Sequence, residues 1–437
     1  MSVRSSRFTV LDLLNKMDKN AYSNLALDSA LEKGNFSERD RNFISRLFYG
    51  IVEHKLTLEY AISLYSSKPL HKLDASIINI LKIGLYQLIY MGSVTDSAAV
   101  NESVILAKQC GKTSASGFVN AVLRSFIRDG KKIIFPENKI ERLGIEYSCD
   151  LKLVKKLCGD YSFEQAEDLL KASVTPHKTF LRVNNLKISS AKLISEFNSL
   201  GIPVKACNIT DNCLEVEKLG GVERCNLFQE GFFHVQDLSS QLCCKVFSPN
   251  PNDTVIDLCA APGGKAFTIT EIMEGLGRVI ACDIHLKRVE LIKKGAERLG
   301  LSIEAVKNDA KIFNESFPQA DKILCDVPCS GFGVIRSKPE LKYTDLKTIS
   351  KLPEVQYDIL CTASKYLKPG GELVYSTCTL NRDENDAVID RFLDEHKNFM
   401  PVNILGEYGN SSHKMTIFPK DFGCEGFFIS KIRKDDL

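Results

Sequence analysis

A change in the spacing of apolar residues divides this sequence more sharply than any other feature. In the first 130 residues apolar side chains recur every three or four positions, as in RNFISRLFYGIVEH, which is typical of amphipathic helices. From about residue 250 short apolar runs such as DTVIDLCA, GRVIACDI and DKILCDVP alternate with helical patterns. The alternation predicts βαβ units and a mostly parallel sheet covered by helices on both faces.

A chain of 437 residues is too long for one core, so three domains are expected. Residues 1–135 have the pattern of an all-α bundle of six or seven helices. Residues 136–235 mix helical patterns with β-like runs such as TFLRVNN, and predict a small α+β module. Residues 236–437 predict an α/β domain with a Rossmann-like sheet.

Composition argues against several classes of protein. There is no apolar run near 18 residues and no signal-peptide pattern at the N-terminus, so we expect a cytoplasmic protein without a membrane partner. The 15 cysteines include no CxxC pair, and histidines number only seven. The usual zinc and iron–sulfur spacings are therefore missing, and no metal site is expected.

The first domain is basic, with 18 Lys and Arg against 12 Asp and Glu in residues 1–135. A basic domain is compatible with RNA phosphates as a partner. A helical surface of mixed charge would give the same count, and charge alone does not decide between the two. If RNA binds there, the basic residues Arg124, Arg128, Lys131 and Lys132 are expected to contact its phosphates.

A glycine-containing loop, DLCAAPGGKA (257–266), follows the first strand of the α/β domain. It fails the P-loop pattern at both ends, where Cys259 and Ala266 stand, and it is not a dinucleotide GxGxxG motif. Later strands are predicted to end at Asp283, at Asp309 and at Asp326. Such acids beside a loop without phosphate-binding chemistry suit a nucleoside that carries cations, such as S-adenosylmethionine.

Two cysteines are predicted at neighbouring strand tips, Cys329 in DVPCSG and Cys378 in YSTCTL. A thiolate can add to carbon 6 of a pyrimidine ring, which makes carbon 5 nucleophilic toward an electrophilic methyl group. A second thiol can then assist release, and Asp326 is placed to hold or protonate nitrogen 3 of the ring. Ordinary buried cysteines are the alternative interpretation.

These motifs resemble the RNA 5-methylcytosine methyltransferases of the bacterial Sun/Fmu and eukaryotic Nop2 type. The carrying stretches are VQDLSSQL (235–242), DLCAAPGGKA, CDI (282–284), KNDA (307–310), DVPCSGFGVIRSKPELKY (326–343) and YSTCTLNRDEN (375–385). The resemblance implies a class I methyltransferase domain in which Cys378 is the nucleophile and Cys329 helps to release the product. It also implies a cofactor site made of Cys259, Ala260, Ala261, Pro262, Gly263, Gly264, Lys265, Asp283, Asp309 and Asp326.

The first domain is similar to the RNA-binding domain of the NusB family, on the stretches RDRNFISRLFYGIVEH and FVNAVLRSFIR. With the LRVN strand (Leu181–Asn184), the domain order resembles bacterial 16S ribosomal RNA cytosine-C5 methyltransferases. This implies methyl transfer from S-adenosylmethionine to a cytosine in a single-stranded or hairpin region of that RNA, by a monomer. Transfer RNA as the substrate, or a non-catalytic RNA-binding factor, are the alternatives. The intact set Cys378, Cys329, Asp326 and Lys265 favours an enzyme.

Overall fold

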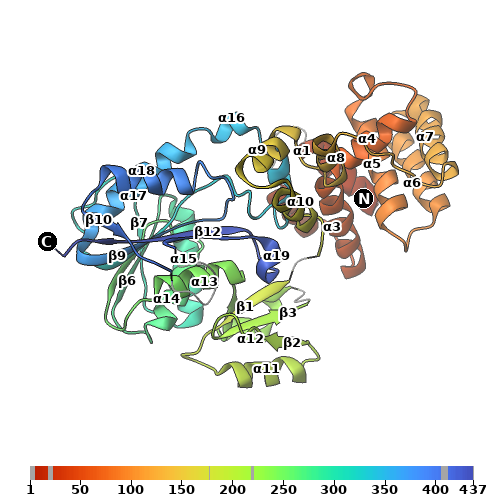
Figure 1. Ribbon diagram of the computed structural model, residues 1–437. Coiled ribbons are helices and arrows are strands. Elements are labelled where there is room, and N and C mark those ends of the chain that lie inside the picture. Colours follow the sequence, from red (N-terminus) through yellow and green to blue (C-terminus); the bar gives the residue numbers. More distant parts are fainter. Residues whose placement is uncertain (1–4, 18–22, 177, 218–220, 405–411, 437) are drawn as a thin grey trace. The chain divides into compact units, whose positions relative to one another are not determined.

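The computed structural model describes residues 5–17, 23–176, 178–217, 221–404 and 412–436. The chain forms two compact units. The first comprises the residues up to Val174 together with Lys338–Thr344, and the second comprises Thr175–Ser337 with Asp345–Leu437. We call them the helical unit and the catalytic unit, and each is described by itself (Figure 1).

Ten α-helices make up the described part of the helical unit (Figure 1). They are α1 (Ser6–Met17), α2 (Ser23–Lys33), α3 (Glu38–Glu53), α4 (Lys55–Tyr65), α5 (Ala75–Tyr90), α6 (Asp96–Gln109), α7 (Ser116–Arg128), α8 (Lys139–Glu146), α9 (Leu151–Asp160) and α10 (Phe163–Ala172). Short 3-10 turns lie at Leu70–Lys72 and Thr113–Ala115. The predicted helical bundle is confirmed.

Local signals place the ends of these helices where the sequence pattern indicates. Ser37, Asp74 and Thr95 cap α3, α5 and α6 through side-chain oxygens that accept a backbone N–H of the first turn. Gly130, just beyond α7, has φ +69°, a left-handed conformation that stops the helix. The apolar stripes of α1 and α3 to α7 form one core, which includes Leu47, Leu81 and Phe126.

A short segment from late in the chain completes the helical unit. Lys338–Thr344 belongs to it, and its 3-10 turn Pro339–Tyr343 (η4) packs against α3. The Lys342 side chain is fully buried, and its ammonium donates to the carbonyls of Glu53 and Tyr147 at 2.7 and 3.0 Å. We call Lys338–Thr344 the strap. Motif spacing does not predict the burial of the strap, because a lysine in a segment that contains a proline is typical of an exposed loop.

The catalytic unit begins with a small antiparallel sheet of order β2-β3-β1-β4. Its strands are β1 (Thr179–Val183), β2 (Val204–Ala206), β3 (Cys213–Val216) and β4 (Phe233–Val235), with helices α11 (Ser190–Ser199) and α12 (Asn226–Gln229). Arg298 ties this sheet to the rest of the unit. Its guanidinium lies 3.7 Å from the ring centroid of Phe228 and donates to the Phe233 carbonyl at 3.1 Å.

The second sheet has eight strands among the described residues, in the order β10-β12-β9-β8-β5-β6-β7, with β11 paired to β12. Strands β9, β8, β5, β6 and β7 run parallel, whereas the pairs at the β12 edge are antiparallel. The strands are β5 (Thr254–Asp257), β6 (Arg278–Asp283), β7 (Glu304–Lys307), β8 (Ala320–Asp326), β9 (Leu367–Thr377), β10 (Phe399–Pro401), β11 (Lys414–Ile417) and β12 (Phe427–Lys434).

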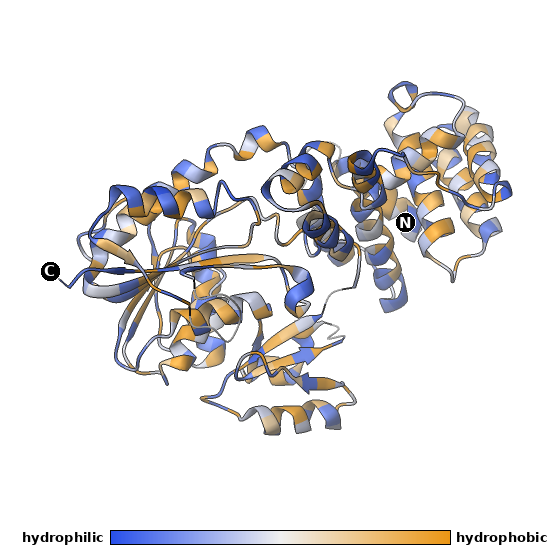
Figure 2. Ribbon diagram, in the orientation of Figure 1, coloured by the Kyte–Doolittle hydropathy of each residue, from blue (hydrophilic) through white to orange (hydrophobic). Residues whose placement is uncertain are grey.

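Alternate residues of the central strands face two different cores. Val255 packs in the core of α13 (Leu238–Phe247), α14 (Gly264–Ile272) and α15 (Leu286–Leu299), whereas Ile256 packs in that of α17 (Leu352–Tyr366) and α18 (Asp386–Glu395). The period of two follows from strand geometry. Figure 2 shows these strands as largely hydrophobic. The Rossmann-like sheet with helices on both faces is therefore confirmed. Short helices α16 (Leu346–Ile349) and α19 (Pro419–Phe422) complete the unit.

The predicted domain limits 1–135, 136–235 and 236–437 remain a prediction. In the structure α8, α9 and α10 belong to the helical unit, while the small sheet shares the catalytic unit. Among the described helices, none combines the length and the apolar character that crossing a membrane requires.

Candidate active site

The carboxyl ends of the parallel strands bring the predicted site residues to one edge of the sheet. Asp283 is the last residue of β6 and Asp326 the last of β8, while Asp309 and Cys378 lie just beyond β7 and β9. The register pairs Asp326 with Ser376 and Asp283 with Lys307. Ligands of open α/β sheets bind along this edge, so the structure gathers side chains that are far apart in sequence where a ligand is expected.

The loop Cys259–Gly264 connects β5 to α14 at the same edge. Its backbone is closely folded, since Ala260 donates to the Cys282 carbonyl at 2.8 Å and Gly263 to the Ala260 carbonyl at 2.7 Å. Gly263 has φ +113°, and a Cβ there would lie 2.3 Å from the Phe267 ring. Only glycine fits this position. The first turn of α14, beginning at Gly264, offers free N–H groups to a ligand.

Lys265 and Asp326 form a close ion pair, with 2.7 Å between Nζ and Oδ2. The other carboxylate oxygen of Asp326 accepts a hydrogen bond from Ser376 Oγ at 2.8 Å. Burial by itself favours the neutral amine, but the charge and hydrogen bond of Asp326, together with the neighbouring thiols of Cys243 and Cys244, outweigh it and raise the pKa of Lys265 above its ordinary value. Lys265 therefore stays a cation and holds Asp326 in one orientation.

The two candidate thiols lie in contact, with 3.2 Å between Cys329 Sγ and Cys378 Sγ. Both side chains are half-buried. The hydrogen bond to Cys378, followed by burial, raises the pKa of Cys329 well above its ordinary value. The Gly333 N–H donates to the Cys378 carbonyl at 3.0 Å, which ties the loop after β8 to the end of β9. Cys329 is therefore held as a thiol that can donate to its neighbour.

Asp283 and Asp309 sit farther along the edge. The Asp283 carboxylate accepts the His285 N–H at 2.8 Å and lies 3.3 Å from the exposed guanidinium of Arg288. A hollow of about 450 Å³ opens beside it, lined by Ile284, His285, Leu286, Lys287, Arg288 and Lys307. Asp309 accepts the Lys311 N–H at 3.0 Å. The Asp283 carboxylate thus lies next to a hollow whose wall includes the apolar Ile284 and Leu286, a combination that suits a nucleoside.

Comparison with known proteins finds matching families and relatives along nearly the whole chain. Residues 244–433 match the model of the 16S rRNA methyltransferase RsmB/F, residues 4–128 that of the NusB family, and residues 152–223 that of a ferredoxin-like domain of RsmF/B-like methyltransferases. A probable ribosomal RNA small subunit methyltransferase B of Bacillus subtilis is 39% identical, covering 99% of this chain and 100% of the relative. This chain belongs to the RsmB family of methyltransferases. A ribosomal RNA small subunit methyltransferase B of Sodalis glossinidius is 32% identical over 91% of both chains.

Solved structures share the fold of this RsmB-family chain. The crystal structure of PH0851 superposes with a TM-score of 0.82, at 23% identity, over 99% of this chain and 100% of that one. NSun6 from Pyrococcus horikoshii, solved with SFG, gives a TM-score of 0.60 at 23% identity, over 69% and 98% of the two chains. The NusB domain, the ferredoxin-like module and the methyltransferase domain with its mixed sheet thus occur in the predicted order.

The residues present fit the S-adenosylmethionine-type cofactor that an RsmB-family methyltransferase implies. Asp257, at the end of β5, is fully buried, and its Oδ2 has no hydrogen-bond partner among the described residues. Burial, followed by the Asp326 charge, raises the pKa of Asp257 to about 7. An orphaned carboxylate oxygen beneath a loop with free N–H groups suits a ligand that carries cationic groups. No group of three or more metal-ligating side chains occurs among the described residues.

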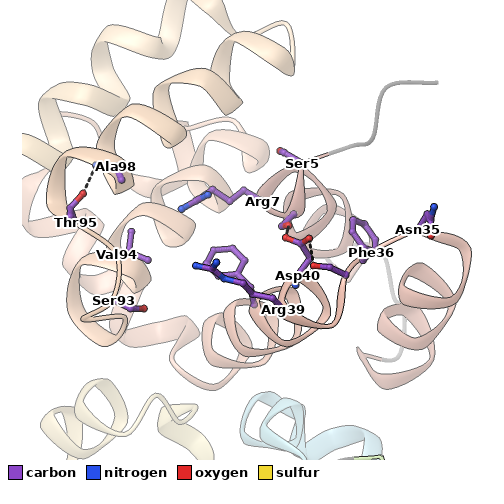
Figure 3. Close-up of a pocket in the computed structure, with 13 residues that line it drawn as sticks. Ser5, Arg7, Asn35, Phe36, Arg39, Asp40, Ser93, Val94, Thr95 and Ala98 are labelled. Atoms are coloured by element: carbon purple, nitrogen blue, oxygen red, sulfur yellow. Dashed lines mark hydrogen bonds between the residues drawn. The ribbon is translucent and has the colours of Figure 1, made fainter.

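The RsmB-family helical unit has a cavity of its own, of about 900 Å³, between α1, α3 and the loop before α6 (Figure 3). Figure 3 shows Arg7 and Arg39 reaching into it. Arg7 lies over the Phe43 ring at 5.0 Å and donates to Gln87 at 2.8 Å, while Asp40 accepts from Ser6 and Ser37. The cavity therefore presents arginines, while its carboxylate is already hydrogen-bonded.

The basic residues predicted to bind RNA lie at the end of α7. Arg124 and Arg128 are exposed and donate to neighbouring side chains of their own helix, at 2.9 and 3.0 Å. Lys132 is exposed as well. Lys131 is neutralised, because its ammonium lies 2.7 Å from the Asp96 carboxylate. Three of the four cations are therefore available to an RNA backbone, and their role remains a prediction.

Sequence reasoning missed the residues that support the site. Asp257 belongs to the glycine-loop motif DLCAAPGGKA, and Ser376 has the pattern of an ordinary strand residue. Glu384 stands in a charged run, NRDEND, which reads as an exposed turn, yet its carboxylate is fully buried. The polar residues around Glu384, such as Asn381, do not predict that its side chain is buried. Only the fold shows that the loops after β8 and β9 enclose it.

Proposed function

We propose that this chain transfers a methyl group from S-adenosylmethionine to carbon 5 of a cytosine in 16S ribosomal RNA. The observation that supports this most strongly is the contact of Cys329 and Cys378 beside the carboxylate of Asp326. Two thiols and an acid at one strand edge are what covalent activation of a pyrimidine needs. Family membership supplies the methyltransferase activity, and the curated relatives are described as small-subunit ribosomal RNA methyltransferases.

The reaction starts with Cys378. Its thiolate adds to carbon 6 of the cytosine, a carbon–sulfur bond forms, and the electron pair of the ring double bond moves toward carbon 5. Asp326 stabilises this adduct by holding or protonating nitrogen 3, and Lys265 keeps Asp326 in place. The cofactor, when bound, supplies an electrophilic methyl group to carbon 5. The carbon 5 proton is then lost to water, its electron pair re-forms the ring double bond, and the carbon–sulfur bond breaks with its electron pair returning to the Cys378 sulfur.

The surroundings of Cys329 support this assignment of roles. Cys329 is held protonated by its bond to Cys378 and by burial, which makes it a poor attacking group. A thiol 3.2 Å away can donate to the Cys378 sulfur as the electron pair returns to it. Cys329 therefore assists release of the methylated base, and Cys378 is the nucleophile.

We further propose how the cofactor and the RNA are held. The loop Cys259–Gly264 and Lys265, with Asp283, Asp309 and Asp326, surround the cofactor. The target cytosine must leave its stack to reach thiols at a sheet edge, so single-stranded or hairpin RNA is the expected substrate. The helical unit contacts phosphates through Arg124, Arg128 and Lys132.

A map of 5-methylcytosine across cellular RNA, with and without this gene, tests the proposal. Loss of one site in 16S ribosomal RNA is the expected result. Loss of a site in transfer RNA would keep the chemistry and replace the substrate. A map that does not change would favour a non-catalytic RNA-binding protein.

A further inference from the structure

A fully buried carboxylate, that of Glu384, lies in the loop that follows Cys378. Oε1 accepts hydrogen bonds from Ser330 Oγ at 2.5 Å and from Asn381 Nδ2 at 2.8 Å. Oε2 accepts from the Ser330 backbone N–H and from Gln356 Nε2, both at 2.9 Å. These four donors are neutral groups, so they solvate the carboxylate in place of water.

Such an arrangement is costly unless every bond is made, because a buried charge has lost its water. A hydrophobic residue of similar size would fill the space without that cost. Buried polar networks of this kind specify one geometry. The question is therefore which geometry the Glu384 carboxylate specifies.

The hydrogen bonds around Glu384 hold the loop of Cys329 on both sides of that cysteine. Gln356 donates to Glu384 and also to the carbonyl of Pro328, at 2.9 Å each. Ser330 is bonded to Glu384 through both its backbone N–H and its hydroxyl. Ser330 is thus bonded to the carboxylate directly and Pro328 through Gln356, so the backbone is held on both sides of Cys329.

The same network reaches the residue that follows Cys378. Ser330 Oγ lies 2.7 Å from Thr379 Oγ1, and the Ser330 proton is directed to Glu384, so Thr379 is the donor in this pair. Thr379 Oγ1 then accepts the Asn381 N–H at 3.2 Å. Hydrogen bonds run in one direction from the Cys378 loop through Ser330 to Glu384, and they hold the two cysteine loops together.

We propose that Glu384 is a positioning residue for methyl transfer, whose carboxylate fixes the loops of Cys329 and Cys378 so that their thiols remain in contact. The proposal rests on the proposed cytosine chemistry, since it explains why the two thiols are paired. The negative charge of Glu384 acts in the same direction as the geometry, because it adds to the effects that raise the pKa of Cys329. Glu384 thereby keeps Cys329 in its thiol form without touching the substrate.

Glu384→Gln tests the proposal with almost no change in shape. Whichever way its amide is turned, the new NH2 group faces a donor, either the Ser330 N–H and Gln356 or the Asn381 amide. We expect kcat for methylation of 16S RNA from cells lacking this gene to fall about 30-fold. The KM values for S-adenosylmethionine and RNA should stay within about threefold, because the Glu384 side chain is fully buried.

Ser330→Ala is the second variant, because it removes the hydroxyl that joins Glu384 to Thr379 and adds no donor. We expect a fall in kcat of about fivefold. Glu395→Gln is the matched control, an exposed glutamate on α18 that should leave kcat unchanged. Each kcat is divided by the number of S-adenosylmethionine-binding sites, so that unfolded protein does not count as lost activity.

A second readout separates positioning from stability. In a Cys329→Ala background the RNA-linked adduct should form about tenfold more slowly when Glu384→Gln is added. If both variants keep kcat and adduct formation within twofold of their parents, the positioning role is refuted. If the unmodified enzyme makes no 5-methylcytosine at all, the proposed function fails instead, and the role of Glu384 falls with it.

Discussion

The ammonium of Lys265 lies 2.7 Å from the carboxylate of Asp326, and the pair stands at the same edge of the sheet as both thiols. Lys265 comes from the first turn of α14 and Asp326 from the end of β8, so the contact joins the helix after the glycine loop to the tip of the neighbouring strand. A carboxylate fixed in this way can hold one edge of a flat ring without rotating.

Asp326→Asn should lower kcat for methylation about 10²-fold or more, the range typical of a lost general acid or base. The amide keeps the shape but cannot transfer a proton to nitrogen 3. Steady-state methylation with tritiated S-adenosylmethionine measures this. Asp358→Asn, on the exposed side of α17, is the control and should retain full activity. An Asp326→Asn enzyme within threefold of normal kcat would exclude Asp326 from proton transfer.

The thiols make a prediction of their own. Cys329→Ala should accumulate protein joined to RNA, because the adduct forms but its release is not assisted. Cys378→Ala should give no adduct, because it lacks the attacking sulfur. A denaturing gel of enzyme incubated with RNA and S-adenosylmethionine shows the difference as a slowly migrating band. The reverse pattern would exchange the roles of the two cysteines.

The buried side chain of His54 allows a prediction of how the stability of the helical unit changes with pH. It is buried and stacked on Tyr90, with ring centroids 4.1 Å apart, and burial lowers the pKa of His54 to about 3. The unfolded chain binds a proton at this residue below about pH 6.5, whereas the folded chain does so only near pH 3. Stability should therefore fall as the pH drops through this window, by up to about 1.4 kcal/mol per pH unit.

His54→Phe keeps the stacking and removes the proton site. Urea unfolding between pH 6.5 and 5, followed on the helical unit by hydrogen exchange, should show a shallower loss of stability in this variant. Equal slopes in the two proteins would mean that other groups control the response to acid.

The packing of the strap allows a prediction that Tyr343 contributes to the stability of the helical unit. Tyr343 in the strap donates to the Val52 carbonyl at 2.7 Å and lies 2.9 Å from Ser148 Oγ. Tyr343→Phe removes the hydroxyl that donates to the Val52 carbonyl and contacts Ser148, which should reduce the stability of the helical unit by about 1–3 kcal/mol. Tyr60→Phe loses one exposed bond, to Ile134, and should cost under about 0.5 kcal/mol. Equal effects in hydrogen exchange would contradict the packing of the strap.

Salt dependence separates two possible RNA-binding surfaces on the helical unit. Replacing Arg124 and Arg128 by alanine should weaken RNA binding and make log Kd less dependent on log salt concentration. With fewer phosphate contacts, fewer counterions are released when the RNA binds. Arg7→Ala with Arg39→Ala makes the same test of the cavity. Filter binding at several salt concentrations gives both slopes. If replacing one of these arginine pairs leaves the slope unchanged, that pair does not contact RNA phosphates.

The sequence was sufficient to predict where the proposed site residues lie, because they stand at or just beyond strand ends, where periodicity predicts the strand and side-chain chemistry indicates a site. Asp283, Asp326, Cys329 and Cys378 all lie where this reasoning placed them. Glu384 could not be predicted in the same way. Its burial results from two loops that meet only after the sheet has formed, and a charged residue in a charged run gives no local signal of it.

The membership of the strap in the helical unit was equally hidden. Hydrophobic periodicity reports neighbours within one element, whereas Lys342 is buried by helices that lie about 200–300 residues earlier. Its buried ammonium is satisfied by backbone carbonyls, and carbonyl positions leave no trace in the residue types of the sequence. Contacts of that kind require the folded chain to be seen.

The strap also sets an order of events during synthesis. A domain encoded entirely at the start of a chain can finish folding while the rest is still being translated. Here the carbonyls of Glu53 and Tyr147 receive their donor only when Lys342 has left the ribosome. The helical unit is therefore completed late, after most of the catalytic unit has been synthesised. A nascent chain that stops before residue 338 carries the helices without the segment that closes them.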